Sequence, residues 1–185
     1  MGNRLLCVTL LVTGCSSDPI SYSAPVGISL KLKSVNTANG SISDEKAITT
    51  EVGNPYAAFV NDARAQLGRD PGVIDVEAVD LTLGAASTGA STLGEIFDGQ
   101  VEVSFEMNVS MTSYSIATKW IGPATGAGPI GFATSFAANT VPDVDYNGLL
   151  NGSFKAVARG PAAEGFSTKG ADCELEVMFT FAAFE

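Results

Sequence analysis

Residues 101–109, VEVSFEMNV, alternate apolar and polar side chains with a period of two. Such alternation is typical of a β-strand that has one face in the core and the other in water. The apolar face consists of Val101, Val103, Phe105, Met107 and Val109. A second candidate strand follows at residues 114–120, so the two stretches predict an antiparallel hairpin.

The period of two recurs elsewhere in the chain. In residues 73–83 the apolar positions change phase once, from Ile74 and Val76 to Val79 and Leu81. A change of phase by one residue predicts a β-bulge. Further strands are predicted at residues 26–32, 131–138, 149–159 and 173–184, with one more short strand after the turn signal Asn39-Gly40. The total is about seven strands.

One stretch has the period of a helix instead. Asn54 is suited to cap the first turn, Pro55 fits the first helical position, and Gly68 can end the helix in a left-handed conformation. The apolar side chains that share one face are Tyr56, Phe59, Val60, Ala63 and Leu67. This pattern predicts an amphipathic helix that packs on the sheet.

Residues 26–185 thus predict a single all-β domain. They contain no internal repeat, and their strands do not alternate with helices as parallel α/β folds require. We expect an antiparallel β-sandwich of about seven strands with one packed amphipathic helix.

The composition excludes several functions. The chain has 10 basic and 20 acidic residues, a net charge of −10, which repels nucleic acid, so we expect no nucleic-acid partner. It contains no histidine, the usual proton shuttle and the commonest metal ligand. Ser-His-Asp chemistry and most zinc chemistry are therefore excluded, and we expect a non-enzymatic protein without a metal or cofactor.

The N-terminal segment has the pattern of an export signal. Arg4 is followed by a short apolar run at residues 5–12. This run is long enough for the core of a signal peptide and too short to span a bilayer. Residues 1–14 are therefore predicted to be removed on export.

The segment Val12-Thr13-Gly14-Cys15 resembles the lipobox of bacterial lipoproteins. The resemblance implies cleavage between Gly14 and Cys15. It also implies a diacylglyceryl group on the sulfur of Cys15 and acylation of its freed amine. The partner implied by these groups is membrane lipid, which the acylated Cys15 enters.

The resemblance also implies a location in the cell envelope. Ser16, rather than an aspartate, follows the cysteine, which in Gram-negative lipoproteins implies export to the outer membrane. Residues 15–25 are polar, contain two prolines, and predict a lipidated tether ahead of the domain. We expect a lipid-anchored envelope protein with a partner-binding or structural role, whose partner is an envelope protein.

Cysteine usage agrees with this expectation. Cys7 is lost with the signal and Cys15 carries lipid, which leaves Cys173. Cys173 lies in an alternating apolar run, so a buried thiol is predicted.

A calcium loop is one alternative. Asp143, Asp145, Asn147 and Gly148 match the opening of an EF-hand loop, but the twelfth position is Phe154 instead of the bidentate glutamate. The EF-hand interpretation therefore fails. A shorter calcium loop and an ordinary turn both remain open, and the first would support a small-ligand or calcium-dependent binding module.

Trp120 is a second candidate site. It stands at a strand end beside a glycine-proline loop, where an aromatic side chain can anchor a ligand or partner, or cap the core. That loop contains GAGPIG at residues 126–131, which satisfies G-x-G-x-x-G. The motif binds dinucleotides only where a helix follows, and the strand-like residues after it predict none.

Paired carboxylates are a third candidate. The pairs are Asp75 and Glu77, Glu102 and Glu106, and Glu174 and Glu176. Two carboxylates held in a cleft could serve an envelope hydrolase. On the polar faces of strands they instead predict a charged outer surface that discourages edge pairing between molecules.

Overall fold

The computed structural model describes residues 20–185, which form eight β-strands and two α-helices. The strands are β1 (Ser21–Lys33), β2 (Ser41–Ile48), β3 (Val73–Leu83), β4 (Gly99–Met107), β5 (Ser113–Ile121), β6 (Ile130–Thr134), β7 (Phe154–Pro161) and β8 (Asp172–Phe184). The helices are α1 (Pro55–Leu67) and α2 (Asp143–Leu150). The predicted cleavage and lipidation residues, Gly14 and Cys15, lie outside the described residues.

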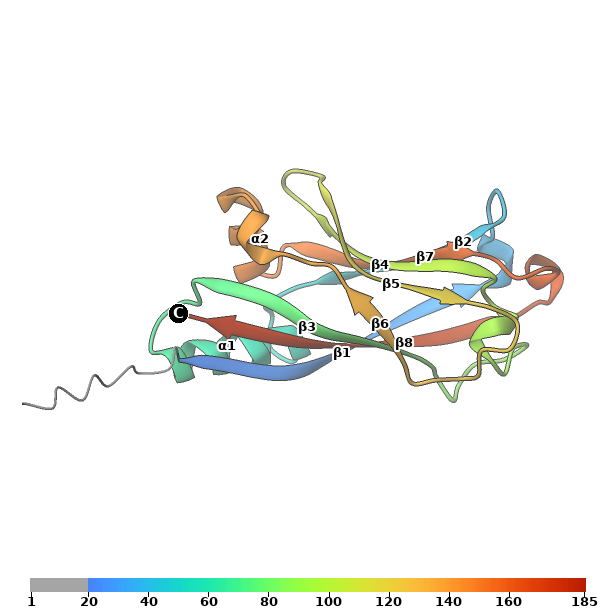
Figure 1. The fold of residues 1–185 in the computed structure, drawn as a ribbon, viewed down its shortest axis with the longest axis horizontal. Helices are drawn as coiled ribbons and strands as arrows, with labels where there is room; N and C mark the ends of the chain where they lie inside the picture. Colours follow the sequence, from blue (N-terminus) through green and yellow to red (C-terminus); the bar gives the residue numbers. More distant parts are fainter. Residues whose placement is uncertain (1–19) are drawn as a thin grey trace, which may run out of the picture.

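The strands are all antiparallel to their neighbours, in the order β1-β8-β3-β6-β5-β4-β7-β2. The sheet folds over into two layers (Figure 1), one with β1, β8 and β3 and the other with β5, β4, β7 and β2. Strand β6 joins the layers by pairing with both β3 and β5. Eight strands in this order make a jelly roll. The predicted antiparallel sandwich is confirmed, with eight strands instead of about seven.

Aromatic side chains fill the space between the two layers. Phe105 on β4 is fully buried, and its ring centroid lies 4.8 Å from that of Phe154 on β7. Across the core it lies 5.4 Å from Phe179 and 6.0 Å from Phe181, both on β8. Because one ring touches both layers, it couples their packing.

Strand β1 begins earlier than the sequence pattern predicts. Ser21 pairs with Phe184, and Tyr22 and Ala24 continue the inward-facing set. Pro25 is tolerated there because β1 is an edge strand, where a missing N–H costs no internal pairing. The predicted tether at residues 15–25 is therefore wrong at its C-terminal boundary, since the strand already starts at Ser21.

Helix α1 forms as predicted. The Asn54 side chain accepts a hydrogen bond of 2.9 Å from the Tyr56 N–H, and Gly68 has the left-handed φ of 71°. Tyr56 is buried between Phe154 of one layer and Phe181 of the other, with centroid distances of 5.2 and 5.1 Å. The helix therefore packs against β1 and helps to close the sandwich.

Two strand boundaries differ from the predictions. Strand β4 ends at Met107, because the Met111 N–H bonds to the Met107 carbonyl and turns the chain toward β5. Val109, predicted to face the core, is 65% exposed in this turn. Strand β7 starts at Phe154, five residues later than predicted, because Leu149 belongs to α2.

Helix α2 occupies residues for which a turn was predicted. Asp143 and Asp145 lie in its first turn, where carboxylates favour the N-terminal dipole. Leu149 is buried, and Gly148 lies so close to Met107 that an added Cβ would be 2.8 Å from its methyl group. Packing against the domain therefore stabilises a helix of only eight residues.

The predicted bulge in β3 and the predicted turn at Asn39-Gly40 are both confirmed. The register of β3 shifts between Val76 and Ala78, as a bulge requires, and Asn39 and Gly40 both have positive φ, 50° and 73°.

Between residues 20 and 185 no helix has the length and apolar character needed to cross a bilayer.

Candidate functional site

The jelly roll has two ends with different surroundings. Phe184 pairs with both Ser21 and Val73, so the start of β1, the end of β8 and the start of β3 meet at one end, on the left in Figure 1. We call this the tether end, since β1 begins there. The opposite end, where β1 and β7 finish and β8 begins, is called the distal end.

Trp120 is exposed at the distal end. It is 71% exposed on β5 and lies opposite Gln100 of β4, and the next outward residue of β4, Glu102, lies opposite Arg159 of β7. Together with Pro161 these residues form what we call the Trp120 face. Beside Trp120, a trough of about 370 Å³ is lined by Gln100, Glu102, Arg159 and Pro161 with the turn at residues 39–41. An exposed indole beside a carboxylate and a guanidinium suits recognition of a partner by stacking and hydrogen bonding.

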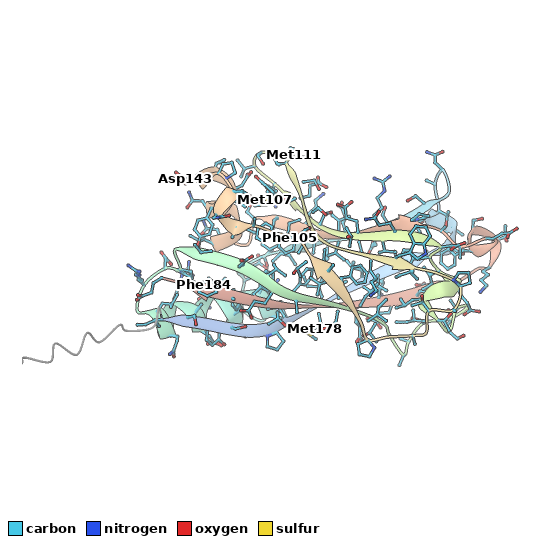
Figure 2. The ribbon with its side chains drawn as sticks, viewed as in Figure 1. Phe105, Met107, Met111, Asp143, Met178 and Phe184 are labelled. Atoms are coloured by element: carbon cyan, nitrogen blue, oxygen red, sulfur yellow. The ribbon has the colours of Figure 1, made fainter. Side chains whose placement is uncertain are left out.

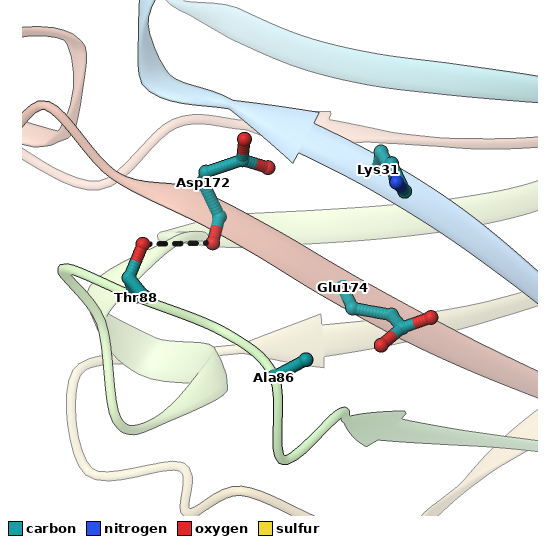
Figure 3. Close-up of a pocket in the computed structure, with 5 residues that line it drawn as sticks. All are labelled: Lys31, Ala86, Thr88, Asp172 and Glu174. Atoms are coloured by element: carbon teal, nitrogen blue, oxygen red, sulfur yellow. Dashed lines mark hydrogen bonds between the residues drawn. The ribbon is translucent and has the colours of Figure 1, made fainter.

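A second trough lies on the outer side of β1 and β8 and has a volume of about 300 Å³. Figure 3 shows its lining residues, Lys31, Ala86, Thr88, Asp172 and Glu174. The loop residue Thr88 donates a hydrogen bond of 3.3 Å to the Asp172 carbonyl. This loop forms the far wall of the trough.

The carboxylates of that trough already have partners. Glu174 accepts a 2.5 Å hydrogen bond from the Ser29 hydroxyl, and Asp172 forms a 3.4 Å ion pair with Lys33. The trough is open to solvent, whereas acid–base catalysis by a carboxyl pair needs a sheltered cleft. The geometry therefore favours a structural role for these groups.

The other acidic pairs lie on outer strand faces. Glu106 is opposite Lys155 in the register of β4 and β7, and Lys155 also contacts Glu45 of β2 at 2.8 Å. On β3, Glu77 accepts a 2.9 Å hydrogen bond from Ser23. These contacts form the charged outer surface that the alternation predicts, and each exposed pair contributes little to stability.

Asp143, Asp145 and Asn147, the oxygen-bearing residues of the alternative calcium loop, do not converge. They lie at alternate positions of α2, so successive side chains point about 200° apart around the helix. Asp145 is 2% exposed and faces inward, whereas Asp143 and Asn147 face solvent. Across residues 20–185 there is no group of three or more acidic or cysteine side chains placed to hold a metal ion. Both the turn and the calcium loop are therefore wrong for this segment.

The inward carboxyl group of Asp145 has a partner that the sequence did not predict. The Tyr114 hydroxyl donates a hydrogen bond of 2.7 Å to its Oδ2 atom, which joins β5 to α2. The Oδ1 atom is buried and accepts no hydrogen bond from any described residue. Burial and the bond to Asp145 raise the pKa of Tyr114 to about 12. No local sequence signal marks this pair, since its members lie 31 positions apart.

Replacing Tyr114 with phenylalanine is expected to lower the free energy of unfolding by about 2 kcal/mol at neutral pH, because it leaves Asp145 buried without a donor. The folded-state pKa lies above the ordinary value of 10.0, so this stabilisation is present below pH 10 and is lost as the pH rises toward 12. Urea unfolding would measure the free energy of unfolding at pH 7 and at pH 11. The loss of stability between the two pH values is expected to be smaller for the variant than for the parent.

Tyr22→Phe is the matched control for this prediction. The half-buried Tyr22 donates a longer bond of 3.3 Å to Asp62, and this bond is exposed to solvent. Its removal is expected to change stability by less than about 0.5 kcal/mol. Equal losses in the two variants would contradict a special role for the buried pair.

The loops at the distal end include a capping box and the glycine-proline loop. Thr92 and Glu95 form the capping box of a short 3-10 turn. Hydrogen bonds from Ser91, first from its backbone N–H, together with Lys169 lower the pKa of Glu95 to about 2. The GAGPIG segment runs directly into β6, so it lacks the helix that a dinucleotide site needs.

Cys173 is fully buried on β8, and burial raises the pKa of its thiol. The predicted buried thiol is confirmed. A protonated, enclosed sulfur is a poor nucleophile, so Cys173 belongs to the core.

Comparison with known proteins gives no family. No protein-family model matches the chain, and a search of curated proteins finds no match. Among solved structures, a chain of Desmodium yellow mottle tymovirus aligns with a TM-score of 0.33 and 10% identity, over 97% of this chain and 95% of that chain. A chain of turnip yellow mosaic virus aligns with a TM-score of 0.29 and 12% identity, over 100% and 90%. A chain from the empty head of turnip yellow mosaic virus gives 0.30 and 10%, over 100% and 90%. At this level the likenesses carry no argument about function.

Proposed function

We propose that this protein is a lipid-anchored component of the cell envelope, attached through acylated Cys15 to the outer membrane, with a non-enzymatic role in binding or organising a partner at the membrane surface. One observation supports the proposal above others. Only six positions separate Cys15 of the lipobox from Ser21, where β1 starts. Six residues reach at most about 20 Å when extended, so an anchored domain would lie against its membrane.

The charge of the domain fits an anchor made of lipid. The chain carries a net charge of −10, and an acidic surface is repelled by anionic headgroups. Membrane attachment would therefore come from the acyl chains. Each buried methylene contributes roughly 0.8 kcal/mol, and two or more chains hold a protein firmly.

The Trp120 face would be the partner-binding surface of this protein. It lies at the distal end, away from the start of β1, so it would remain accessible on an anchored domain. Exposed tryptophan and arginine side chains are enriched among residues that dominate protein interfaces. A second candidate function is capture of a small ligand in the adjoining trough of about 370 Å³, which is lined by polar groups.

Two variants of the full-length protein test the proposal in membranes of a bacterium that processes lipoproteins. Mass spectrometry of the parent is expected to show a chain that starts at Cys15 and carries acyl groups. Cys15→Ser is expected to leave the membrane fraction almost completely. Trp120→Ala is expected to stay anchored but to lose at least about tenfold of a co-purifying envelope protein, as loss of an interface anchor does.

Each variant serves as the control for the other, since one affects the anchor and the other the face. A chain that keeps its N-terminal methionine and an unmodified Cys15 would refute the anchor. Unchanged co-purification with Trp120→Ala would refute the role of the face. Loss of a small molecule instead of a protein from the Trp120→Ala sample would favour the second candidate function.

A further inference from the structure

We propose that the tether end of the jelly roll inserts apolar side chains into the headgroup region of the membrane, so that the domain is docked on the lipid surface as well as anchored to it. The inference rests on the proposed lipid anchor. The side chains concerned are Ile20, Val109, Met111 and Val144, and we call them the docking residues.

Exposed large apolar side chains gather at the tether end and in the segments that border it. Within residues 20–185, eight large hydrophobic residues are exposed, and five of them lie just ahead of β1, in α2, or in the two turns beside α2 at residues 108–112 and 49–53. Val109 and Met111 are 65% and 68% exposed in the turn between β4 and β5, and Val144 is 50% exposed on α2. Ile20, just ahead of β1, is 45% exposed, and the fifth residue, Val52, precedes α1. An apolar set gathered on one side marks an interaction surface.

Contacts connect the docking residues through one continuous region. The Tyr114–Asp145 bond of 2.7 Å holds the β4–β5 hairpin against α2. On its other side, α2 donates a 2.6 Å hydrogen bond from Tyr146 to the Pro71 carbonyl. The adjacent Gly72 N–H bonds to the Phe184 carbonyl, and Phe184 pairs with the start of β1. Figure 2 shows Asp143 and Phe184 at the left end of the molecule, and Met111 on its upper edge, somewhat left of the middle.

The backbone at Met111 gives a separate indication. Its φ is 59°, a left-handed conformation that glycine and asparagine adopt more easily than methionine. The side chain is exposed, so core packing does not require an apolar residue there. Such a strained, exposed apolar position points to a contact outside the domain.

The chemistry of the hairpin tip fits a lipid interface better than a charged partner. Residues 108–112, NVSMT, carry no charge and alternate small polar with apolar side chains. Segments of this kind place apolar groups at the boundary of headgroups and acyl chains while their polar groups stay hydrated. Because the proposed tether reaches only about 20 Å, the surface beside it would be the bilayer that holds the lipid.

The test uses the full, processed chain reconstituted in phosphatidylcholine vesicles that contain brominated lipid. An environment-sensitive fluorophore is attached to Met111→Cys or, as the control, to Val35→Cys, which is 78% exposed at the distal end. Native Cys173 is buried and would not be labelled. We expect lipid bromine to quench the probe at position 111 at least about threefold more than the probe at position 35, since quenching needs depth in the interface.

Several outcomes decide the matter. Equal, weak quenching at both positions on a chain that mass spectrometry shows to be acylated would overturn the docking and leave the anchor intact. Crosslinking between two copies through position 111, without lipid quenching, would overturn it in favour of a dimer. An unacylated Cys15 would remove the proposed function together with this inference. Val144→Cys provides a second labelling site if Met111→Cys does not fold.

Discussion

Replacing Phe105 with alanine is expected to destabilise the folded domain by about 3 to 5 kcal/mol, the range for a large aromatic residue removed from a packed core. Phe105 is fully buried, and its ring contacts partners from both layers of the jelly roll. Truncation would leave a cavity that neither layer can fill without moving the other. Urea unfolding followed by far-ultraviolet circular dichroism would measure the loss.

Trp120→Ala is the control for this change. It removes an even larger aromatic side chain, but one that is 71% exposed, so its effect on stability is expected to stay within about 0.5 kcal/mol. Phe105→Leu keeps most of the side-chain volume and is expected to lower the free energy of unfolding by less than about 1.5 kcal/mol. It provides a second measurement of the same site if the alanine variant does not fold. A loss below about 1 kcal/mol for Phe105→Ala would contradict the central position of this ring.

Gly94→Ala is expected to lower the free energy of unfolding by about 3 kcal/mol, because the added methyl group would overlap main-chain atoms that cannot rotate away. Its Cβ would approach the carbonyl oxygens of Gly122 and Pro123, at 2.4 and 2.7 Å. The same residue donates a hydrogen bond of 3.1 Å to Thr125, so the turn at residues 93–95 is fixed against the loop that follows β5. Thermal and urea unfolding would both register the loss.

Gly126→Ala is the matched control in the same loop. No atom lies within 4 Å of the Cβ that this change would add, and the substitution is expected to be neutral within about 0.5 kcal/mol. If both alanine variants were equally stable, the close approach of main-chain atoms at Gly94 would not be what excludes a side chain from this position.

Elements with a strong local pattern could be predicted from the sequence. Alternation located β4 and β8, and the capping residues Asn54 and Gly68 marked the bounds of α1. In each case the residues that determine the element are adjacent in the chain. The strand order could not be predicted in the same way, since β1 pairs with β8 and β2 with β7 across most of the sequence.

Helix α2 shows why the prediction failed elsewhere. Aspartate, asparagine and glycine favour turns, but aspartate is also common in the first turn of a helix. Contacts from distant segments, including the bond from Tyr146 to Pro71, decide between the two. The spacing of Tyr146, Leu149 and Leu150 was the one local sign of a helix.

The candidate site was predictable only in part. Trp120 was singled out from its position beside a glycine-proline loop, but its outward direction was not, because the register shifts between Val103 and Ser104 and leaves Ile116 and Ala117 both buried. The exposed residues of the tether end were missed, since Val109 continues the apolar alternation of its strand. Only the turn at Met107 shows that it leaves the core.

The pairing of β1 with β8 determines how the domain would bear mechanical load. All 13 residues of β1 lie in register with β8, in an antiparallel ladder whose hydrogen bonds run perpendicular to the strands. A pull applied at Ser21 and resisted at the distal end would act along the strand axis, so the bonds of the ladder would be sheared together instead of opened one after another. A protein held by its N-terminus while a partner tugs at its far end would thus resist unfolding over the full length of its first strand.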